Sequence, residues 1–158
     1  MIRTANNNDL KSLTELFIQL HNHHVKIKPE TFVMPDREWF SQRILEILND
    51  KEQTVFVYED KEDNGSFTIK GYAVVKIMDV NTEDKLPRRI CYTNCFAIAE
   101  KYRRSGIGTK LFNAVKEYGR ENSCGTVQLG VSACNESAVK FYEKMGLVPR
   151  TIQMETRI

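Results

Sequence analysis

The chain has 158 residues, of which 41% are hydrophobic and 28% charged, and its formal net charge is +2. This length is typical of one domain that buries a core without cross-links. The small net charge gives no support for a nucleic-acid or membrane-surface partner. The N-terminus lacks the apolar run of a signal peptide, and no stretch approaches the ~18 apolar residues of a membrane span. We therefore expect one soluble, cytoplasmic domain over residues 1–158.

The four cysteines are Cys91, Cys95, Cys124 and Cys134, and none of them has CxxC spacing. Structural zinc sites use paired cysteines, so this spacing gives little support for a metal. A domain of this size does not need disulfides. We predict reduced thiols and no metal.

The first third of the chain predicts a short strand followed by two helices. Ile2–Ala5 is a short apolar run, and the asparagines with Asp9 offer a helix cap. Apolar side chains then recur at helical spacing, which predicts a helix ending near His21–His24. After two prolines, Asp36 can cap a second helix. The apolar positions are Leu10, Leu13, Phe17 and Leu20 in the first helix and Phe40, Ile44, Ile47 and Leu48 in the second.

The middle of the chain indicates an antiparallel meander. Thr54–Tyr58 is rich in β-branched and aromatic residues, which predicts a strand. The turn at Asp63–Gly65 separates it from a second strand, Phe67–Ile77, because Asn-Gly is a strong hairpin signal. Asp79–Arg89 is expected to be a charged loop, and Ile90–Ile98 a third strand.

The last third predicts two more helices and further strands. Ile107, Leu111, Val115 and Tyr118 lie at helical spacing, Thr126–Val131 at strand spacing, and a final helix runs from Asn135 to a glycine cap at Gly146. Leu147–Val148 and Thr151–Ile158 are expected to supply terminal strands. The order β-α-α-β-β-β-α-β-α-β, without repeats or linkers, indicates one α+β domain.

The stretch Tyr92–Thr109 carries the clearest chemical signal. A strand leads into a basic, glycine-containing turn, and the turn opens a helix. Gly106 and Gly108 let the backbone approach a ligand closely, and the first N–H groups of the helix have no partner inside it. With Arg103 and Arg104 beside the positive end of the helix dipole, the turn is suited to bind a pyrophosphate.

Other phosphate-binding motifs do not fit this turn. The sequence contains neither a Walker-type G-x-x-x-x-G-K-[ST] nor the G-x-G-x-x-G of dinucleotide folds. The alternative on the turn alone is an ordinary strand–turn–helix junction with glycines for packing.

Two motifs resemble those of the GCN5-related N-acetyltransferases. The run Arg103-Arg104-Ser105-Gly106-Ile107-Gly108 is similar to the R/Q-x-x-G-x-G/A signature with which that family binds coenzyme A pyrophosphate. Downstream, Asn135-x-x-Ala138-x-x-Phe141-Tyr142-Glu143-Lys144-x-Gly146 resembles the second signature, N-x-x-A-x-x-F/L-Y-x-K-x-G-F. Leu147 stands where the family usually has Phe.

The resemblance implies a GNAT-like α+β domain with a mixed, mostly antiparallel sheet of six to seven strands and about four helices. It also implies acetyl-CoA as cosubstrate. In the family, the strand before the first signature separates from its neighbour at a bulge, and its free backbone groups bind the pantetheine arm. The cofactor-binding residues implied are Phe96, Ala97, Ile98, Arg103, Arg104, Ser105, Gly106, Ile107, Gly108, Thr109, Asn135, Ala138 and Tyr142.

The resemblance implies a general acid but no general base. Tyr142 lies where many relatives place the acid that protonates the departing thiolate; the alternative is a half-buried core tyrosine. Many relatives use a strand carboxylate as the base, and here that position is Asn94, which cannot accept the proton. A water ordered by Asn94, Tyr92 or a backbone carbonyl is the expected substitute, whereas Glu100 is expected to be a solvated surface charge.

The acceptor is the least defined part of the prediction. His21, His23 and His24 lie where relatives often line the acceptor site, but a polar helix end is the favoured interpretation of them. Trp39 can line the pocket too, although a core or surface anchor is the favoured interpretation. Acidic residues in the expected acceptor loops suit a cationic amine or are simply solvated. These residues are Glu30, Asp36, Glu38, Asp79, Glu83 and Asp84.

The predicted function is transfer of an acetyl group from acetyl-CoA to a primary amine of a small molecule or protein, by direct attack in a ternary complex. One alternative is a non-catalytic coenzyme A-binding module, since Asn94 replaces the carboxylate. Another is an interaction protein that binds no nucleotide. Homodimers are common in the family, but nothing in the residues requires one.

Overall fold

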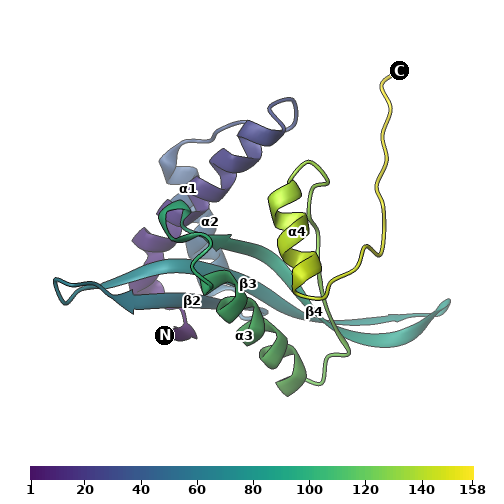
Figure 1. Cartoon of the computed structure of the whole chain (residues 1–158). Helices are drawn as coiled ribbons and strands as arrows, with labels where there is room; N and C mark the ends of the chain where they lie inside the picture. Colours follow the sequence, from purple (N-terminus) through teal and green to yellow (C-terminus); the bar gives the residue numbers. More distant parts are fainter.

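The computed structural model describes residues 1–158 and contains one five-stranded sheet in the order β1-β2-β3-β4-β5 (Figure 1). Neighbouring strands are antiparallel except for β4 and β5, which are parallel. The strands are β1 (Ile2–Thr4), β2 (Gln53–Lys61), β3 (Phe67–Thr82), β4 (Lys85–Ile98) and β5 (Thr126–Leu129). The helices are α1 (Leu10–Ile27), α2 (Arg37–Asn49), α3 (Ile107–Glu121) and α4 (Glu136–Lys144), with short 3-10 turns at Asn7–Asp9 and Glu100–Tyr102.

The helices cover the two faces of this sheet, and each face has its own apolar core. On one face α1 and α2 pack against β2, β3 and β4, with Leu13, Ile44 and Tyr72 almost completely buried. On the other face α3 packs through Leu111 and Val115 against β3 and β4. Because side chains alternate along a strand, neighbouring residues of β4 serve different cores.

The predicted element order and caps are largely confirmed. Asp36 caps α2 by accepting a hydrogen bond from the Trp39 backbone N–H at 2.8 Å, and Asn135 caps α4 in the same way through Ala138 at 3.3 Å. Gly146, just beyond α4, has φ +90°, the left-handed conformation expected after a helix end. The first helix runs three residues further than His24, to Ile27.

Two predictions about strands are wrong. The charged segment Asp79–Arg89 is not a loop, because β3 and β4 pair as a hairpin as far as Thr82 and Lys85. Backbone pairing there tolerates charged side chains, since both faces of the hairpin tip are exposed to solvent. The terminal strands are also absent: Leu147–Val148 and Thr151–Ile158 have no strand partner, so the sheet has five strands instead of six to seven.

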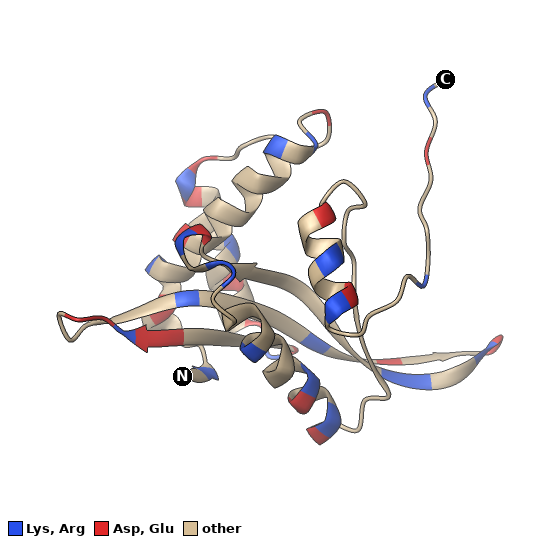
Figure 2. Ribbon diagram, in the orientation of Figure 1, with Lys and Arg blue, Asp and Glu red and all other residues tan.

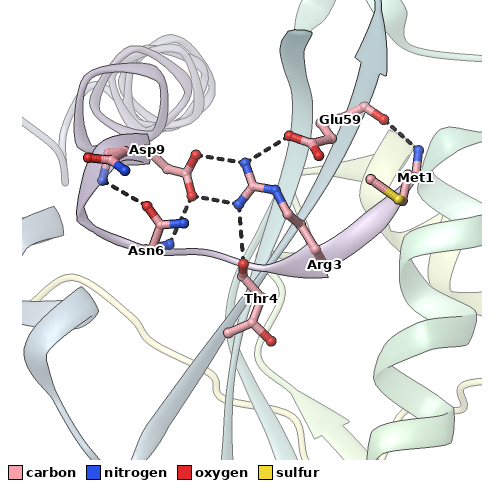
Figure 3. A network of polar contacts seen from close by, with 7 residues as sticks. Met1, Arg3, Thr4, Asn6, Asp9 and Glu59 are labelled. Carbon is pink, nitrogen blue, oxygen red and sulfur yellow. Dashed lines mark hydrogen bonds and ion pairs between the residues drawn. The ribbon is translucent and has the colours of Figure 1, made fainter.

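A buried ionic network fastens the first strand to α1 and β2 (Figure 3). The Arg3 guanidinium donates to both carboxylate oxygens of Asp9, at 2.7 and 2.9 Å, and to Glu59 at 2.8 Å. Both carboxylates are buried, and Asp9 also accepts from the Asn6 backbone N–H. The hydrogen bonds from Arg3 hold the pKa of Asp9 below its usual range. The network is structural, since it lies at the junction of these elements and away from the turn before α3.

None of the helices is both long enough and apolar enough to cross a lipid bilayer.

Candidate active site

The turn between β4 and α3 has the backbone conformation expected of an anion-binding loop. Gly106 is the N-cap of α3 and has φ +83°, and Arg104 also has a positive φ of 62°. The first intrahelical hydrogen bond runs from the Lys110 N–H to the Gly106 carbonyl at 3.1 Å. The N–H groups of the preceding positions therefore have no partner within the helix. The space around Gly106 is open, since a Cβ built on this residue would meet nothing within 4 Å.

Two arginines lie in the turn next to these N–H groups, in the blue ribbon segment that precedes α3 (Figure 2). Arg103, Arg104 and Ser105 are all exposed. The Arg103 Nε donates to the carbonyl of Ile98 at 3.3 Å, which holds the guanidinium at the end of β4. Ser105 Oγ donates to the Tyr102 carbonyl at 2.6 Å and so closes the turn. The predicted pyrophosphate residues thus lie together at the N-terminus of α3, with two exposed arginines beside its positive end.

Gly108 has a different role from Gly106. A Cβ at Gly108 would lie 3.3 Å from Cε2 of Phe141 on α4 and 3.7 Å from Cγ1 of Ile98. The missing side chain therefore lets the first turn of α3 approach both α4 and the end of β4. The two glycines of the signature are needed for separate reasons, one for backbone conformation and one for close packing.

β4 separates from β5 next to a bulge. The pairing of β3 with β4 shifts between Val74, opposite Cys95, and Val75, opposite Thr93, so Asn94 has no partner on β3. The last pair between β4 and β5 is Thr93 with Leu129. β4 then continues to Ile98 with no strand on its β5 side. No strand therefore pairs with the predicted pantetheine residues 96–98 on that side, and the Ile98 carbonyl accepts only from the Arg103 side chain.

Tyr142 lies in an aromatic cluster at the point where β4 separates from β5. Its ring is 6.2 Å from that of Phe96 on β4, 5.9 Å from that of Phe112 on α3 and 5.3 Å from that of Phe141. Burial, with a smaller contribution from Cys95, raises the pKa of Tyr142 to about 12. The phenol is therefore protonated at neutral pH and is able to donate a proton.

Asn135, the N-cap of α4, also contacts a histidine near the end of α1. Besides accepting from Ala138, its Oδ1 lies 3.4 Å from Nε2 of His23. The two residues are 112 positions apart, and no local pattern predicts their contact. Of the three histidines, His23 is the one that reaches a residue of the second signature.

Asn94 is held by a residue of β2, on the other side of β3, instead of standing free. Its Nδ2 donates to Oε1 of Gln53 at 2.9 Å, and Gln53 in turn donates to Asp50 at 2.6 Å. Two successive hydrogen bonds, through Gln53, therefore link the Asp50 carboxylate to Asn94 at the bulge. Glu100, by contrast, is exposed in the 3-10 turn after β4.

The other two histidines belong to an aromatic group between α1 and α2. Nε2 of His21 lies 2.6 Å from the Val33 carbonyl, and the ring packs edge-on against Phe32 and Phe40. His24 is half-buried, and this burial, together with the neighbouring histidines, lowers its pKa. Trp39 stacks on Phe17 at 6.1 Å between ring centroids yet remains 47% exposed. The C-terminal end of α1 thus lies among aromatic side chains as well as polar ones.

A shallow groove of about 380 Å³ runs along α2 beside this group. It is lined by Asp36, Glu38, Trp39, Gln42, Arg43 and Glu46. Two of the acidic residues named from the sequence, Asp36 and Glu38, therefore line it. Glu83 and Asp84 lie instead at the tip of the β3–β4 hairpin, Asp79 lies within β3 opposite Arg89, and Glu30 lies in the α1–α2 connection.

The cysteines are free, and nowhere do three or more His, Cys, Asp or Glu side chains gather as a metal-binding group. Burial raises the pKa of the Cys91 thiol to about 11 and also raises that of Cys95. Cys134 is exposed and directly precedes Asn135.

This chain is similar to curated acetyltransferases over part of their length. Human N-alpha-acetyltransferase 30 is 40% identical over 57 residues, which are 36% of this chain and 16% of the human protein. An uncharacterized N-acetyltransferase of Lactobacillus delbrueckii subsp. lactis is 30% identical over 79 residues, 50% of this chain and 45% of that protein. The matched region thus spans less than half of each of these relatives.

Solved structures share the fold over the whole chain. A mutant of a Bacillus halodurans protein superposes with a TM-score of 0.91 at 24% identity and covers 100% of this chain and 99% of its own. The aminoglycoside N-acetyltransferase AAC(6′)-Iy in complex with CoA superposes with a TM-score of 0.71 at 18% identity, over 100% and 95% of the two chains.

The sequence profile of the acetyltransferase (GNAT) family matches residues 11–147, which include both signatures and the bulged strand. This match covers most of the chain and agrees with the five-stranded fold. The protein therefore belongs to the GNAT family of acetyltransferases.

Proposed function

We propose that this protein transfers an acetyl group from acetyl-CoA to a primary amine. The observation that carries the proposal is the continuity of the basic turn at Gly106 with the free backbone of residues 96–98 and the Tyr142 phenol. In this assignment the turn binds the pyrophosphate, β4 binds the pantetheine arm, and Tyr142 faces the thioester sulfur. AAC(6′)-Iy, which shares this fold, was solved with CoA bound.

The reaction is direct attack of the amine nitrogen on the thioester carbonyl. A C–N bond forms, the tetrahedral intermediate collapses, and the C–S bond breaks to release coenzyme A. A backbone N–H of residues 96–98 stabilises the oxyanion, a contribution of roughly 3 kcal/mol per donor in other acyl transfers. Tyr142 donates a proton to the departing thiolate. Its raised pKa keeps the phenol protonated until this step.

The proton of the attacking amine leaves through water at the bulge. An amine with a reference pKa near 10.4 is mostly protonated at neutral pH and must lose a proton to react. Asn94 does not accept it, but the chain of hydrogen bonds from Asn94 through Gln53 to Asp50 orders the surface where such a water would lie. Holding the amine in place supplies part of the remaining acceleration.

The α2 groove supports a cationic acceptor. Asp36, Glu38 and Glu46 bring three carboxylates to the same groove as the partly exposed Trp39, and Arg43, the one cation among the lining residues, pairs with Glu46. An ammonium group gains both from nearby carboxylates and from the face of an indole ring. The amine, whether on a small molecule or on a protein N-terminus or lysine, approaches from this side of the sheet.

The experiment has two stages. Calorimetric titration with acetyl-CoA, using ATP and NAD as controls, is expected to show selective micromolar binding. A panel of small amines and short peptides is then scored by mass spectrometry for acetylated product. Binding without any product would favour a coenzyme A-binding module, and no binding by folded protein would contradict the site assignment.

A further inference from the structure

The residue before the basic turn, Tyr102, is held by a segment far away in the sequence. Its hydroxyl donates a hydrogen bond to Oε1 of Glu62 at 3.2 Å, across 40 positions of the chain. Its ring packs against the apolar core that α1 and α2 share with the sheet. Glu62 lies directly after β2, in the hairpin that leads to β3. The β2–β3 hairpin, which contributes no residue to the predicted cofactor site, therefore contacts the residue next to that site.

A lysine on β3 fixes the carboxylate that Tyr102 binds. Nζ of Lys70 lies 3.3 Å from Oε1 of Glu62 and 3.4 Å from Oδ2 of Asp60, and it lies 4.6 Å from the centroid of the Tyr102 ring. The Lys70 side chain is only 12% exposed, so its contacts are screened less than those of a surface ion pair. Pairing with Lys70 lowers the pKa of Glu62, which keeps this carboxylate ionised at neutral pH. We refer to Tyr102, Glu62 and Lys70 as the hairpin clamp.

The backbone transmits the position of Tyr102 to the basic turn. The Tyr102 N–H donates to the Ala99 carbonyl at 2.9 Å, and the Tyr102 carbonyl accepts from Oγ of Ser105 at 2.6 Å. Arg104 lies inside this loop and has φ 62°. A non-glycine residue keeps a positive φ only when the surrounding structure holds it there. The fixed position of Tyr102 supplies one end of that hold.

The turn has little support of its own. Residues 103–106 are all exposed, so none of them packs into the core. In Figure 2 the turn and the β2–β3 hairpin lie on the same side of the molecule, in agreement with the contact between Tyr102 and Glu62. A loop that adopts its binding conformation for only a fraction of the time binds its ligand more weakly by that fraction. The order that the hairpin clamp gives to the turn therefore bears directly on affinity.

We propose that Tyr102 is a positioning residue for the cofactor: the hairpin clamp holds it, and it holds residues 103–106 in the conformation that binds the pyrophosphate of acetyl-CoA. This inference rests on the proposed function, because it concerns the same binding site. The clamp acts on the turn and not on the thioester, so it should affect acetyl-CoA binding and leave the chemical step unchanged.

Two measurements on Tyr102→Phe test the proposal. The variant keeps the ring and removes only the hydroxyl. In the free protein, the hydrogen-bonded amides of Tyr102, Arg103 and Lys110 should exchange faster with solvent than in the wild type, while those in the middle of α3 should be unchanged. In calorimetry, the Kd for acetyl-CoA should rise about 5–20-fold, as expected when one hydrogen bond to a charged group is lost, whereas kcat at saturating acetyl-CoA should stay within about twofold.

Substitutions of Glu62 show whether the contact itself is responsible. Glu62→Ala should weaken acetyl-CoA binding about as much as Tyr102→Phe does. The double variant should bind no more weakly than either single variant, because the two side chains act through one contact. Glu62→Gln keeps an oxygen that accepts from the phenol, so it should restore most of the affinity.

Two matched controls remove similar contacts elsewhere. Tyr118→Phe removes a hydroxyl that lies 2.9 Å from Oγ1 of Thr54. Glu52→Ala breaks an ion pair with Lys76 at the other end of the β2–β3 pairing. Both controls should bind acetyl-CoA like the wild type.

Several results would overturn the proposal. Unchanged exchange and unchanged affinity in Tyr102→Phe would do so, and so would additive losses in the double variant. Lower stability with unchanged affinity would give the clamp a purely structural role and would also overturn it. Wild-type protein that binds no acetyl-CoA would instead contradict the proposed function, and the exchange rates alone would then decide whether the clamp orders the turn.

Discussion

The two sides of the candidate active site are built in different ways. The cofactor side comes mainly from one continuous stretch, Tyr92–Thr109, whose strand, bulge, turn and helix follow one another along the chain. The proposed acceptor side is assembled from the end of α1, the first turns of α2 and the N-cap of α4, brought together only by the fold. A cofactor shared by a family can be recognised by local backbone conformation, whereas acceptor choice depends on tertiary contacts between variable segments.

The largest effect is expected on the cofactor side. Gly108→Glu places a side chain against Phe141 and a negative charge at the pyrophosphate turn, so acetyl-CoA affinity should fall by at least about 100-fold, or ~2.7 kcal/mol. Calorimetry measures this affinity. Gly125→Glu is the control, because a Cβ there meets nothing within 4 Å. Equal affinity in the two variants would remove the turn from the binding site.

The next largest effect is expected at Tyr142, between the cofactor side and the proposed acceptor side. If Tyr142 is the general acid, Tyr142→Phe should lower kcat by roughly 10²–10⁴-fold while leaving acetyl-CoA affinity nearly unchanged. Tyr118→Phe is the matched control at the far end of α3, where the hydroxyl lies 2.9 Å from that of Thr54. A kcat within twofold of wild type would leave Tyr142 as a packing residue.

The pH dependence of the same step provides a separate check. Because the pKa of Tyr142 is raised to about 12, the acid stays protonated throughout the range in which the enzyme can be assayed. The kcat should rise with pH as the bound amine loses its proton and should then stay level up to pH 10. A decline in kcat between about pH 8 and 10, with the protein still folded, would contradict this role.

A smaller effect is expected in the scaffold, at the junction of β1, β2 and the start of α1. Arg3→Ala leaves two buried carboxylates without their counter-charge, and we expect a loss of about 2–3 kcal/mol in the free energy of unfolding, reduced from the fully buried case because Arg3 is partly exposed. Denaturant unfolding measures this value, and Arg43→Ala, which removes an exposed ion pair to Glu46, is the control.

The same network predicts the direction of the acid response. The pKa of Asp9 is lower in the folded state, so its contribution to stability is present above the unfolded pKa of about 3.9 and is lost as pH falls through the folded value. The stability difference between wild type and Arg3→Ala should therefore shrink below about pH 4. A difference that stays constant from pH 7 to pH 3 would show that Arg3 acts only through packing.

The smallest effect is expected in the α2 groove. A cation over an exposed indole ring gains about 0.5–1 kcal/mol, so Trp39→Ala should raise the KM for a cationic acceptor by about 2–5-fold without changing acetyl-CoA affinity. Phe67→Ala, an exposed aromatic at the β2–β3 hairpin, is the control. An unchanged KM would place the acceptor outside the groove.

The sequence was most informative where local pattern determines structure. The caps at Asp36 and Asn135, the glycine turn and four helices were all predicted, because each depends on residues within a few positions. The Thr151–Ile158 strand was predicted from the same kind of alternation but is absent, since a strand exists only when another segment pairs with it.

The contacts on the acceptor side were not predictable in this way. His23 approaches Asn135 across 112 positions, and Asn94 is held by Gln53 from another strand. Neither residue type requires such a partner, and no spacing rule connects them. From the sequence, Asn94 was expected only to replace the carboxylate and to help order a water, whereas the fold connects it through Gln53 to Asp50.

The different exposure of the four cysteines has a practical consequence for measuring turnover. Release of coenzyme A is commonly followed with an aromatic disulfide that reacts with any accessible thiolate, and accessible thiols react before buried ones. Cys134 is exposed, whereas burial raises the pKa of Cys91 and Cys95. The reagent would therefore attach a bulky aromatic group beside the Asn135 cap during the assay itself. A Cys134→Ser background keeps the colour signal from coenzyme A and removes this side reaction.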